Sequence, residues 1–538
     1  MKHRLRAAGA LAAACCLFAF AACSAGEAAP ARGSRPARAD TTAASRESGW
    51  TTAAQTAVKA SAQTVPTGPD AATQQSAATH PRVTTETSGP QKTAAGARPA
   101  ASGAAGMQSS AVSTSASKPT AAATAATRVT TAATTAALAW RPLNHAVMKA
   151  CWLSQYDLVR VMRVSGGGRY AQRPQADFTA KACAILQNLA DMGFNTVIIQ
   201  VRPFGDSFYP SDYYPWSDYV TGTMGKTPDY DPFAILVEEA HRRGLSVHAW
   251  INPIRGMKEE LIASVPARYK LRQWYDDPAA RGDKILVAGG LWYLNPAHGD
   301  VRALIAAGAA EVVRKYHVDG LHMDDRFYPT TAASFDAAAY TRYREGGGTL
   351  SLKDFRLDCF NRVVRGVYDA VKKENPLVLY GVSPDANISR DYSVHYADVR
   401  TWCAKPGYID YICPQIYYGM EHQGHPFTAA AREWSALIQT PGVRLVAGMT
   451  LGKTISEYDQ WAGAGAYEWR DHKDVLARCV RSLSGVGHLW GISLFSYQYL
   501  FDPVSGAANS KTAREVENLL PALRGLSPAC SPERATDS

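Results

Sequence analysis

The chain has 538 residues and a formal net charge of +10 at pH 7. Residues up to Asn144 contain 14 Lys and Arg against 5 Asp and Glu, which accounts for nine of the ten excess positive charges. The remaining residues are therefore nearly neutral, and this argues against a nucleic-acid-binding domain. Anionic wall polymers or lipid headgroups suit the basic segment better, and a purely solvated linker explains the same composition.

The first residues have the pattern of a secretory signal peptide. Lys2, Arg4 and Arg6 precede an apolar run that ends at Ala22 and is too short to span a bilayer comfortably, so we predict a signal peptide over residues 1–22. The run leads into Phe-Ala-Ala-Cys23, which resembles a bacterial lipobox. We expect Cys23 to be the lipidated first residue of a lipoprotein, held at the extracellular face of the cell membrane or elsewhere in the cell envelope. Cleavage without lipidation, giving a secreted protein, is the alternative.

Residues 23–144 consist almost entirely of Ala, Thr, Ser, Gly, Pro and Gln. Such a segment buries too little apolar surface to offset the conformational entropy lost on folding, so we expect a disordered linker, here called the tether. A flexible tail is expected over residues 526–538. The seven cysteines beyond Cys23 are odd in number and lack metal-like or disulfide-like spacing, which predicts mostly buried thiols, no metal and no cofactor.

Residues 145–525 alternate short β-rich runs with amphipathic helical runs and contain eight such repeats. Strict alternation predicts a parallel sheet, and eight units predict closure into a (β/α)8 TIM barrel; an open doubly wound sheet is the alternative. The predicted strands are 148–154, 196–202, 246–252, 320–325, 378–383, 409–417, 444–450 and 491–497. The predicted helices are 177–192, 231–243, 301–316, 355–374, 427–438, 473–483 and 512–523, with a fifth crossover near 396–404.

Side chains that alternate with apolar residues along these strands are expected to face the barrel interior. Near the C-terminal ends of the strands this places polar and aromatic groups together at the end of the barrel where such folds build active sites, here called the mouth. The expected inward residues are Gln200, Arg202, His248, Trp250, Asn252, His322, Asp324, Gln415, Tyr417 and Tyr497. Aromatic residues in the loops after the second and third strands either bind sugar rings or, as we favour for any single ring, pack a small core beneath the loops.

The stretch Val318-Asp-Gly-Leu-His-Met-Asp-Asp-Arg-Phe-Tyr-Pro329 carries the strongest functional signal. It predicts a buried strand that delivers Asp324 and Asp325 to the mouth. Adjacent acids at a strand end also serve as helix caps, turn residues or cation ligands. A metal site with His248 or His322 is disfavoured, because isolated histidines on strands are more often hydrogen-bonded core residues.

Four motifs together resemble one known family. They are Gln200-Val-Arg-Pro203, His248-Ala-Trp-Ile-Asn-Pro253, Asp319–Pro329 and Ile409-Asp-Tyr-Ile-Cys-Pro-Gln-Ile-Tyr417. The chain resembles the bacterial glycosyl-hydrolase-like family 10 proteins, often lipoproteins, whose barrels include peptidoglycan glycan hydrolases. The resemblance covers roughly residues 149–501 and implies a barrel glycosidase that cleaves an extracellular polysaccharide.

Glycoside hydrolysis commonly uses one protonated and one ionised carboxyl group. Asp324 is the first candidate for the catalytic carboxylate. Asp325 or Glu421 is the candidate for the general acid. Asp385 is a further carboxylate near the mouth, and Asp206 is a weaker candidate. We expect the substrate to contact Arg202, Trp250, Asn252, His322, Tyr328, Gln415, Tyr417 and Tyr497. A substrate-assisted route, in which a sugar N-acetyl group attacks, remains open. The alternative function is a non-catalytic, surface-anchored barrel that binds glycans.

Overall fold

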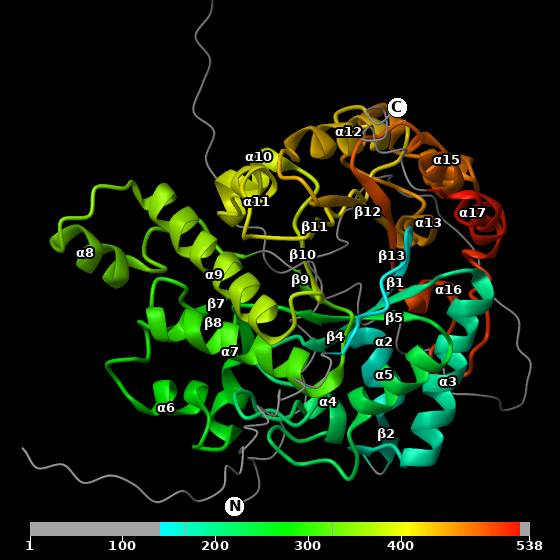
Figure 1. Ribbon diagram of the computed structural model, residues 1–538. Helices are drawn as coiled ribbons and strands as arrows, with labels where there is room; N and C mark the ends of the chain where they lie inside the picture. The colour runs from blue at the N-terminus through cyan, green and yellow to red at the C-terminus, as the bar shows by residue number, and fades with distance from the viewer. Residues whose placement is uncertain (1–139, 167, 325–326, 528–538) are drawn as a thin grey trace, which may run out of the picture. The chain divides into compact units, whose positions relative to one another are not determined.

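Eight parallel strands close into a barrel, as predicted. The computed structural model describes residues 140–166, 168–324 and 327–527. Around the barrel the strand order is β1-β13-β12-β11-β10-β9-β5-β4, and every neighbouring pair is parallel (Figure 1). The barrel strands are β1 (Met148–Leu153), β4 (Thr196–Arg202), β5 (Ser246–Ile251), β9 (Gly320–Asp324), β10 (Leu379–Ser383), β11 (Tyr411–Ile412), β12 (Arg444–Thr450) and β13 (Leu489–Phe495).

The sixth strand, β11, is much shorter than the predicted 409–417. Pro414 has no backbone N–H to donate, so the regular ladder stops before it. Pairing resumes at Gln415, which forms isolated bridges with Asp385 on one side and Gly448 on the other. The chain therefore still runs in the barrel wall at Gln415.

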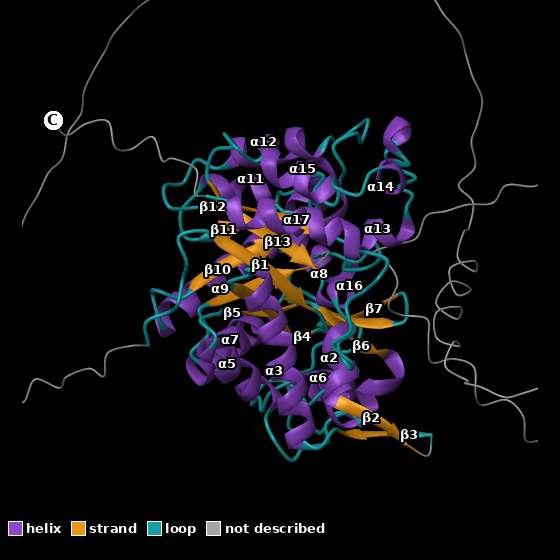
Figure 2. Ribbon diagram, turned by 90° about the vertical axis from the view of Figure 1, so that its right-hand side faces the viewer, coloured by secondary structure: helices purple, strands orange, loops and turns teal. Residues whose placement is uncertain are grey.

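Helices surround the strands (Figure 2), and each predicted helix is present with small differences at its ends. Helix α3 ends at Gly193, whose φ of 92° is one that glycine adopts without strain. Asp231 begins α5 by accepting hydrogen bonds from the N–H groups of Phe233 and Ala234. The crossover helices are α3 (Gln175–Met192), α5 (Pro232–Arg242), α7 (Gly299–Tyr316), α9 (Leu352–Glu374), α11 (Val399–Ala404), α12 (Phe427–Leu437), α15 (Val475–Ser482) and α17 (Ala513–Gly525).

Insertions enlarge the loops between these elements. A hairpin of β2 (Arg163–Gly166) and β3 (Arg169–Gln172) projects from the barrel (Figure 2), and β6 (Arg255–Lys258), β7 (Ile285–Ala288) and β8 (Leu291–Leu294) form a small sheet after β5. Short helices are α2 (Gln155–Met162), α4 (Asp218–Thr221), α6 (Lys270–Asp276), α8 (Ala337–Glu345), α10 (Ile388–Arg390), α13 (Gly452–Ser456), α14 (Glu468–Asp471) and α16 (Tyr497–Leu500). Short 3-10 helices lie at Glu259–Ser264 and Gly463–Gly465, and a π-helical turn lies at Asp391–His395.

The core has two layers. Large side chains fill the barrel itself, among them Trp152, Trp250, Tyr411 and Trp490. A larger apolar layer lies between strands and helices. The loop aromatics Phe208, Tyr209, Tyr214, Trp216, Trp274 and Trp292 belong to that outer layer, so their packing role is confirmed.

Polar side chains connect neighbouring strands at the N-terminal end of the barrel, here called the floor. These connections are called clamps. In three places the residue just before a strand bonds the backbone N–H of the neighbouring strand. Asn195 accepts from Lys149 N, Asp319 from Val247 N and Asp410 from Tyr380 N, at 2.9, 2.7 and 2.7 Å. Asp319 is fully buried and also accepts from His241 Nε2 at 2.8 Å. The clamps hold adjacent strands at a fixed offset.

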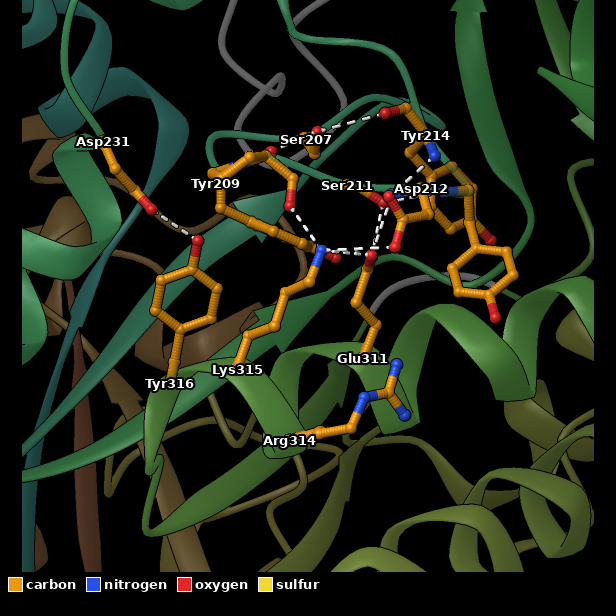
Figure 3. A network of polar contacts seen from close by, with 12 residues as sticks. Ser207, Tyr209, Ser211, Asp212, Tyr214, Asp231, Glu311, Arg314, Lys315 and Tyr316 are labelled. Atoms are coloured by element: carbon orange, nitrogen blue, oxygen red, sulfur yellow. Dashed lines mark hydrogen bonds and ion pairs between the residues drawn. The ribbon is translucent and has the colours of Figure 1, made fainter. Parts of the chain in front are cut away.

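A second polar network ties the loop after β4 to α7 (Figure 3). The buried carboxylate of Glu311 accepts hydrogen bonds from Ser211 Oγ at 2.5 Å and Asp212 N at 2.8 Å, and it pairs with Lys315 Nζ at 2.8 Å. Ser211 Oγ accepts in turn from the N–H groups of Tyr213 and Tyr214. The loop is therefore fixed against the helix layer.

The described chain contacts the barrel from Trp140 onward, four residues before the predicted boundary. Asn375 Nδ2 donates to Trp140 O at 2.5 Å, and the Trp140 ring stacks on His317 with centroids 5.2 Å apart. The predicted signal peptide, Cys23, all of the tether before Trp140 and nearly all of the C-terminal tail lie outside the described residues.

Among the helices of the described residues, none combines the length and apolar character needed to cross a membrane.

Candidate active site at the barrel mouth

Asp324 lies at the C-terminal tip of β9, in the barrel wall at the mouth. Its carboxylate oxygen Oδ1 accepts a hydrogen bond from Gln415 Nε2 at 2.6 Å, and its backbone oxygen accepts one from Asn252 Nδ2 at 3.1 Å. The residue is 8% exposed. Hydrogen bonds to a carboxylate favour its ionised form, and a nearly buried position fixes its direction.

Amide side chains brace this carboxylate from neighbouring strands. Asn252 Oδ1 accepts from Gln200 Nε2 at 2.7 Å, and Gln200 Oε1 accepts from Gln155 N at 2.7 Å. Each amide uses both of its polar ends, so the row cannot rotate freely. The mouth is thus preorganised across β4, β5 and β9.

His322 lies one layer below Asp324, inside the barrel, and is not one of the substrate-contacting residues as we had expected. Its Nδ1 bonds Tyr411 OH at 3.0 Å, and its Nε2 accepts from Trp152 Nε1 at 3.3 Å. Burial lowers the pKa of His322 well below its usual value, so the ring is neutral. Since His322 is fully buried, it does not reach substrate. It belongs to the barrel core.

Asp385 provides a second carboxylate on the next strand end. Its backbone forms the bridge with Gln415, the residue that also holds Asp324. Its Oδ2 lies 3.8 Å from both Arg390 Nε and His395 Nε2, and the side chain is 21% exposed. Behind it, Asp391 is buried, and burial together with the charge of Asp385 raises its pKa well above the usual range.

Tyr417 and Phe495 line the same region. Their rings have centroids 6.1 Å apart, and Phe495 also contacts Trp152 at 6.1 Å. Burial raises the pKa of Tyr417 well above its usual value, and the charges of Asp324 and Asp385 add to this shift. The phenol is therefore a permanent hydrogen-bond donor within electrostatic reach of both carboxylates. Trp250 points into the barrel as predicted and is 5% exposed.

Arg202 does not face the mouth, which corrects our expectation. The β4–β5 register shifts between Gln200 and Arg202, and this irregularity breaks the alternation. The guanidinium lies over the Tyr214 ring at 4.3 Å and against Gly308 of α7, in the layer between strands and helices.

Tyr328 and Tyr497 are also packing residues, contrary to the sequence-based assignment. Tyr328 is 1% exposed and packs against Tyr396, with centroids 5.2 Å apart. Tyr497 begins α16, where strand alternation has ended, and its hydroxyl accepts from Asn188 Nδ2 of α3 at 3.0 Å. Both rings are therefore directed into the helix layer.

Glu421 is directed away from the other carboxylates. It forms ion pairs with His472 and Arg478, both at 3.3 Å, and its side chain is 49% exposed. Asp206 is buried beneath the loop after β4, and burial raises its pKa to about 6. Asp325 lies outside the described residues.

Two aromatic residues at the mouth were missed by the sequence analysis. Phe495 shares the alternation that we used for Tyr497, so its inward direction was available from the pattern. Trp461 is 76% exposed in the loop after β12, and no periodicity marks it. Backbone bonds hold this loop in place, because Gln423 N donates to Ala462 O and Asp459 Oδ1 accepts from Trp461 N.

The family model and the two sequence relatives agree on the family. The family described as glycosyl hydrolase-like 10 matches residues 147–462. The chain is 34% identical over 303 residues to glycosyl hydrolase YngK of Bacillus subtilis. This alignment covers 53% of the present chain and 58% of YngK. It is 32% identical over 355 residues to glycosyl hydrolase DigH of Escherichia coli, and this alignment covers 60% of the present chain and 77% of DigH. The glycoside hydrolase domain of PgaB from Bordetella bronchiseptica aligns at 12% identity with a TM-score of 0.45, covering 69% and 99%.

Proposed function

Because this chain belongs to the glycosyl hydrolase-like 10 family, we propose that it is an extracellular glycoside hydrolase that cleaves a polysaccharide, with bacterial peptidoglycan as the substrate class. The observation that carries this proposal is the pair of carboxylates at the mouth, Asp324 and Asp385, both linked to Gln415. Two carboxyl groups on adjacent strand ends are the minimum that acid/base glycoside hydrolysis requires.

The surroundings divide the two roles. Asp324 accepts a hydrogen bond from the Gln415 amide, which favours the ionised carboxylate and suits the group that attacks or stabilises the sugar cation. Asp385 lies at the end of the neighbouring strand with its side chain partly exposed, and we assign it the role of general acid. Asp325 adjoins Asp324 in sequence and is the other candidate for the acid.

Aromatic and hydroxyl groups supply the means to hold a sugar. The hydroxyl of Tyr417 is a donor within electrostatic reach of both carboxylates, and the ring of Phe495 packs beside Tyr417. Trp461 offers an exposed indole on a loop that follows a barrel strand at the mouth side. Aromatic faces pack against the apolar faces of sugar rings, so these residues would hold successive units of a glycan.

Replacing Asp324 by Asn tests the catalytic role. The change keeps the shape but removes the negative charge, so we expect release of reducing ends from insoluble peptidoglycan to fall by several orders of magnitude, about 10³-fold or more. Thermal unfolding and sedimentation with the glycan should change little, because the carboxylate lies at the mouth. An Asp324→Asn enzyme with the wild-type rate would refute the assignment.

The matched control is Asp229→Asn, since Asp229 is exposed in the loop before α5. It should keep the wild-type rate. A panel of other insoluble glycans in the same assay identifies the substrate. If the wild-type protein binds glycan but releases no reducing ends from any of them, the barrel is a binding protein instead of an enzyme.

We also propose that Cys23 carries a lipid that holds the protein at the cell envelope, because a charged n-region and a short apolar run precede it. Cys23→Ser should shift the protein from the membrane fraction to the soluble fraction. An unchanged distribution would contradict this proposal.

A further inference from the structure

A cavity outside the barrel is lined by residues in and next to helices α7, α8 and α9. These three helices lie on the left of Figure 1. Its volume is about 280 Å³, near the lower end of the range for small-molecule sites. Four of its lining residues are basic by type, namely His298, Arg302, Arg342 and Arg362, whereas Asp358 is its one acidic lining residue. Such a wall favours an anion.

Arg302 is the central cation of this cavity. Its NH1 donates to the backbone oxygens of Pro296 and Ala297 at 2.7 and 2.8 Å. Within the described part of the chain no carboxylate lies in ion-pair range of it. Burial lowers the pKa of Arg302, and the charges of Asp358 and Asp300 offset only part of this shift. A half-buried guanidinium that no carboxylate contacts directly is stabilised when an anion binds to it.

The other two arginines are held in place by neighbouring carboxylates. Arg342 NH2 contacts both oxygens of Asp283 at 2.7 and 2.8 Å, and Arg362 NH2 contacts Asp358 at 2.8 Å. These contacts use one nitrogen of each guanidinium group. The side chains of Arg342 and Arg362 are 50% and 61% exposed, respectively. The remaining N–H groups can still donate to a ligand, because each guanidinium carries five N–H donors.

We infer that this cavity binds a small oxyanion, a carboxylate or phosphate group carried by an envelope polymer, with Arg302 at its centre and Arg342 and Arg362 beside it. Guanidinium groups match the paired oxygens of both anions. The cavity begins at the N-terminal end of α7, whose dipole adds to the attraction. The site would hold an acidic substituent of a glycan at a distance from the mouth.

Calorimetric titration of the full chain tests the site with three probes at constant ionic strength: inorganic phosphate, glucuronate and neutral glucose. We expect phosphate or glucuronate to bind and glucose not to bind. A response to phosphate alone identifies a phosphate-bearing polymer, and a response to glucuronate alone identifies a carboxylate-bearing one. Absence of binding by both anions, or equal binding of glucose, would overturn the inference.

Variants locate the binding. Arg302→Gln should weaken it about tenfold, since a charge-assisted contact is lost. Arg362→Gln changes an exposed side chain, so it should weaken binding several-fold with an unchanged melting temperature. Arg470→Gln, at an exposed arginine on α14, is the control. Unchanged affinity in both cavity variants would place the anion elsewhere. None of the probes has a polymer bond to cleave, so this result is independent of hydrolysis.

Discussion

His248 and His322 show how a barrel interior keeps ionisable groups neutral. The two rings share one partner, since the Tyr411 hydroxyl lies 2.8 Å from His248 Nδ1 and 3.0 Å from His322 Nδ1. Burial lowers the pKa of His248 to about 4. A positive charge at this point would have no water around it, so the histidines act as uncharged hydrogen-bonding residues.

This gives a pH prediction for stability. Between pH 6.5 and 4 the unfolded chain protonates His248 but the folded chain does not, so stability falls as the pH is lowered through this window. His248→Gln removes that contribution and keeps a polar group near Tyr411. Urea unfolding should show the wild type losing about 3 kcal/mol more than the variant from pH 7 to pH 4.

The comparison between the two proteins cancels carboxyl groups that titrate in the same range, such as Asp157 and Asp206. His472→Gln, an exchange at a half-exposed ring, is the control and should follow the wild type. Parallel pH profiles for wild type and His248→Gln would mean that His248 takes up its proton in the folded state.

At the scale of elements, one buried ion pair attaches the segment before α8 to α9. Arg356 Nε lies 3.1 and 3.0 Å from the two oxygens of Asp336, and both side chains are fully buried. Arg356 also donates to Ala332 O at 2.7 Å and Tyr396 OH at 3.0 Å. No pattern in the sequence marks Asp336 as a buried residue.

Asp336→Asn should therefore lower the free energy of unfolding by about 3–5 kcal/mol, because it leaves a buried guanidinium without a counter-charge. Chemical denaturation measures the loss. Glu517→Gln breaks an exposed pair with Arg514 and should cost less than about 1 kcal/mol. A similar loss in the free energy of unfolding for both variants would show that the buried pair stabilises the fold no more than an exposed pair.

The sequence predicted the elements well but the directions of single side chains less well. Period-two alternation placed Asp324, Asn252 and Gln415 correctly in the wall of the mouth. It failed for Arg202, where an irregular register interrupts the strand, and for Tyr497, where a helix has begun. Glu421 and Asp336 lie in loops, where no periodicity constrains direction, so their ion pairs become visible only when the helices have packed.

On the scale of the whole molecule, the N-terminal boundary of the folded part can be tested with two deletions. Removing residues 1–139 should leave the melting temperature unchanged, since the described contacts begin at Trp140. Removing residues 1–144 also deletes the Trp140 ring contact and the hydrogen bonds to Asn375 and Asp319. These are worth about 2 kcal/mol, which corresponds to a fall of about 2–3 °C for a folded part of this size. Equal melting temperatures would leave no stabilising role for residues 140–144.

The clamps at the floor have a consequence for the chemistry at the mouth. Asp319 and Asp324 stand at opposite ends of one strand, about 16 Å apart at 3.3 Å per residue. A slip of one residue along β9 would turn Asp324 toward the helices and present Met323 to the glycan. The hydrogen bond from Val247 N to Asp319 thus fixes the register of β9, although Asp319 does not contact the substrate. The position of the catalytic carboxylate at the mouth therefore depends on hydrogen bonds at the opposite end of the barrel.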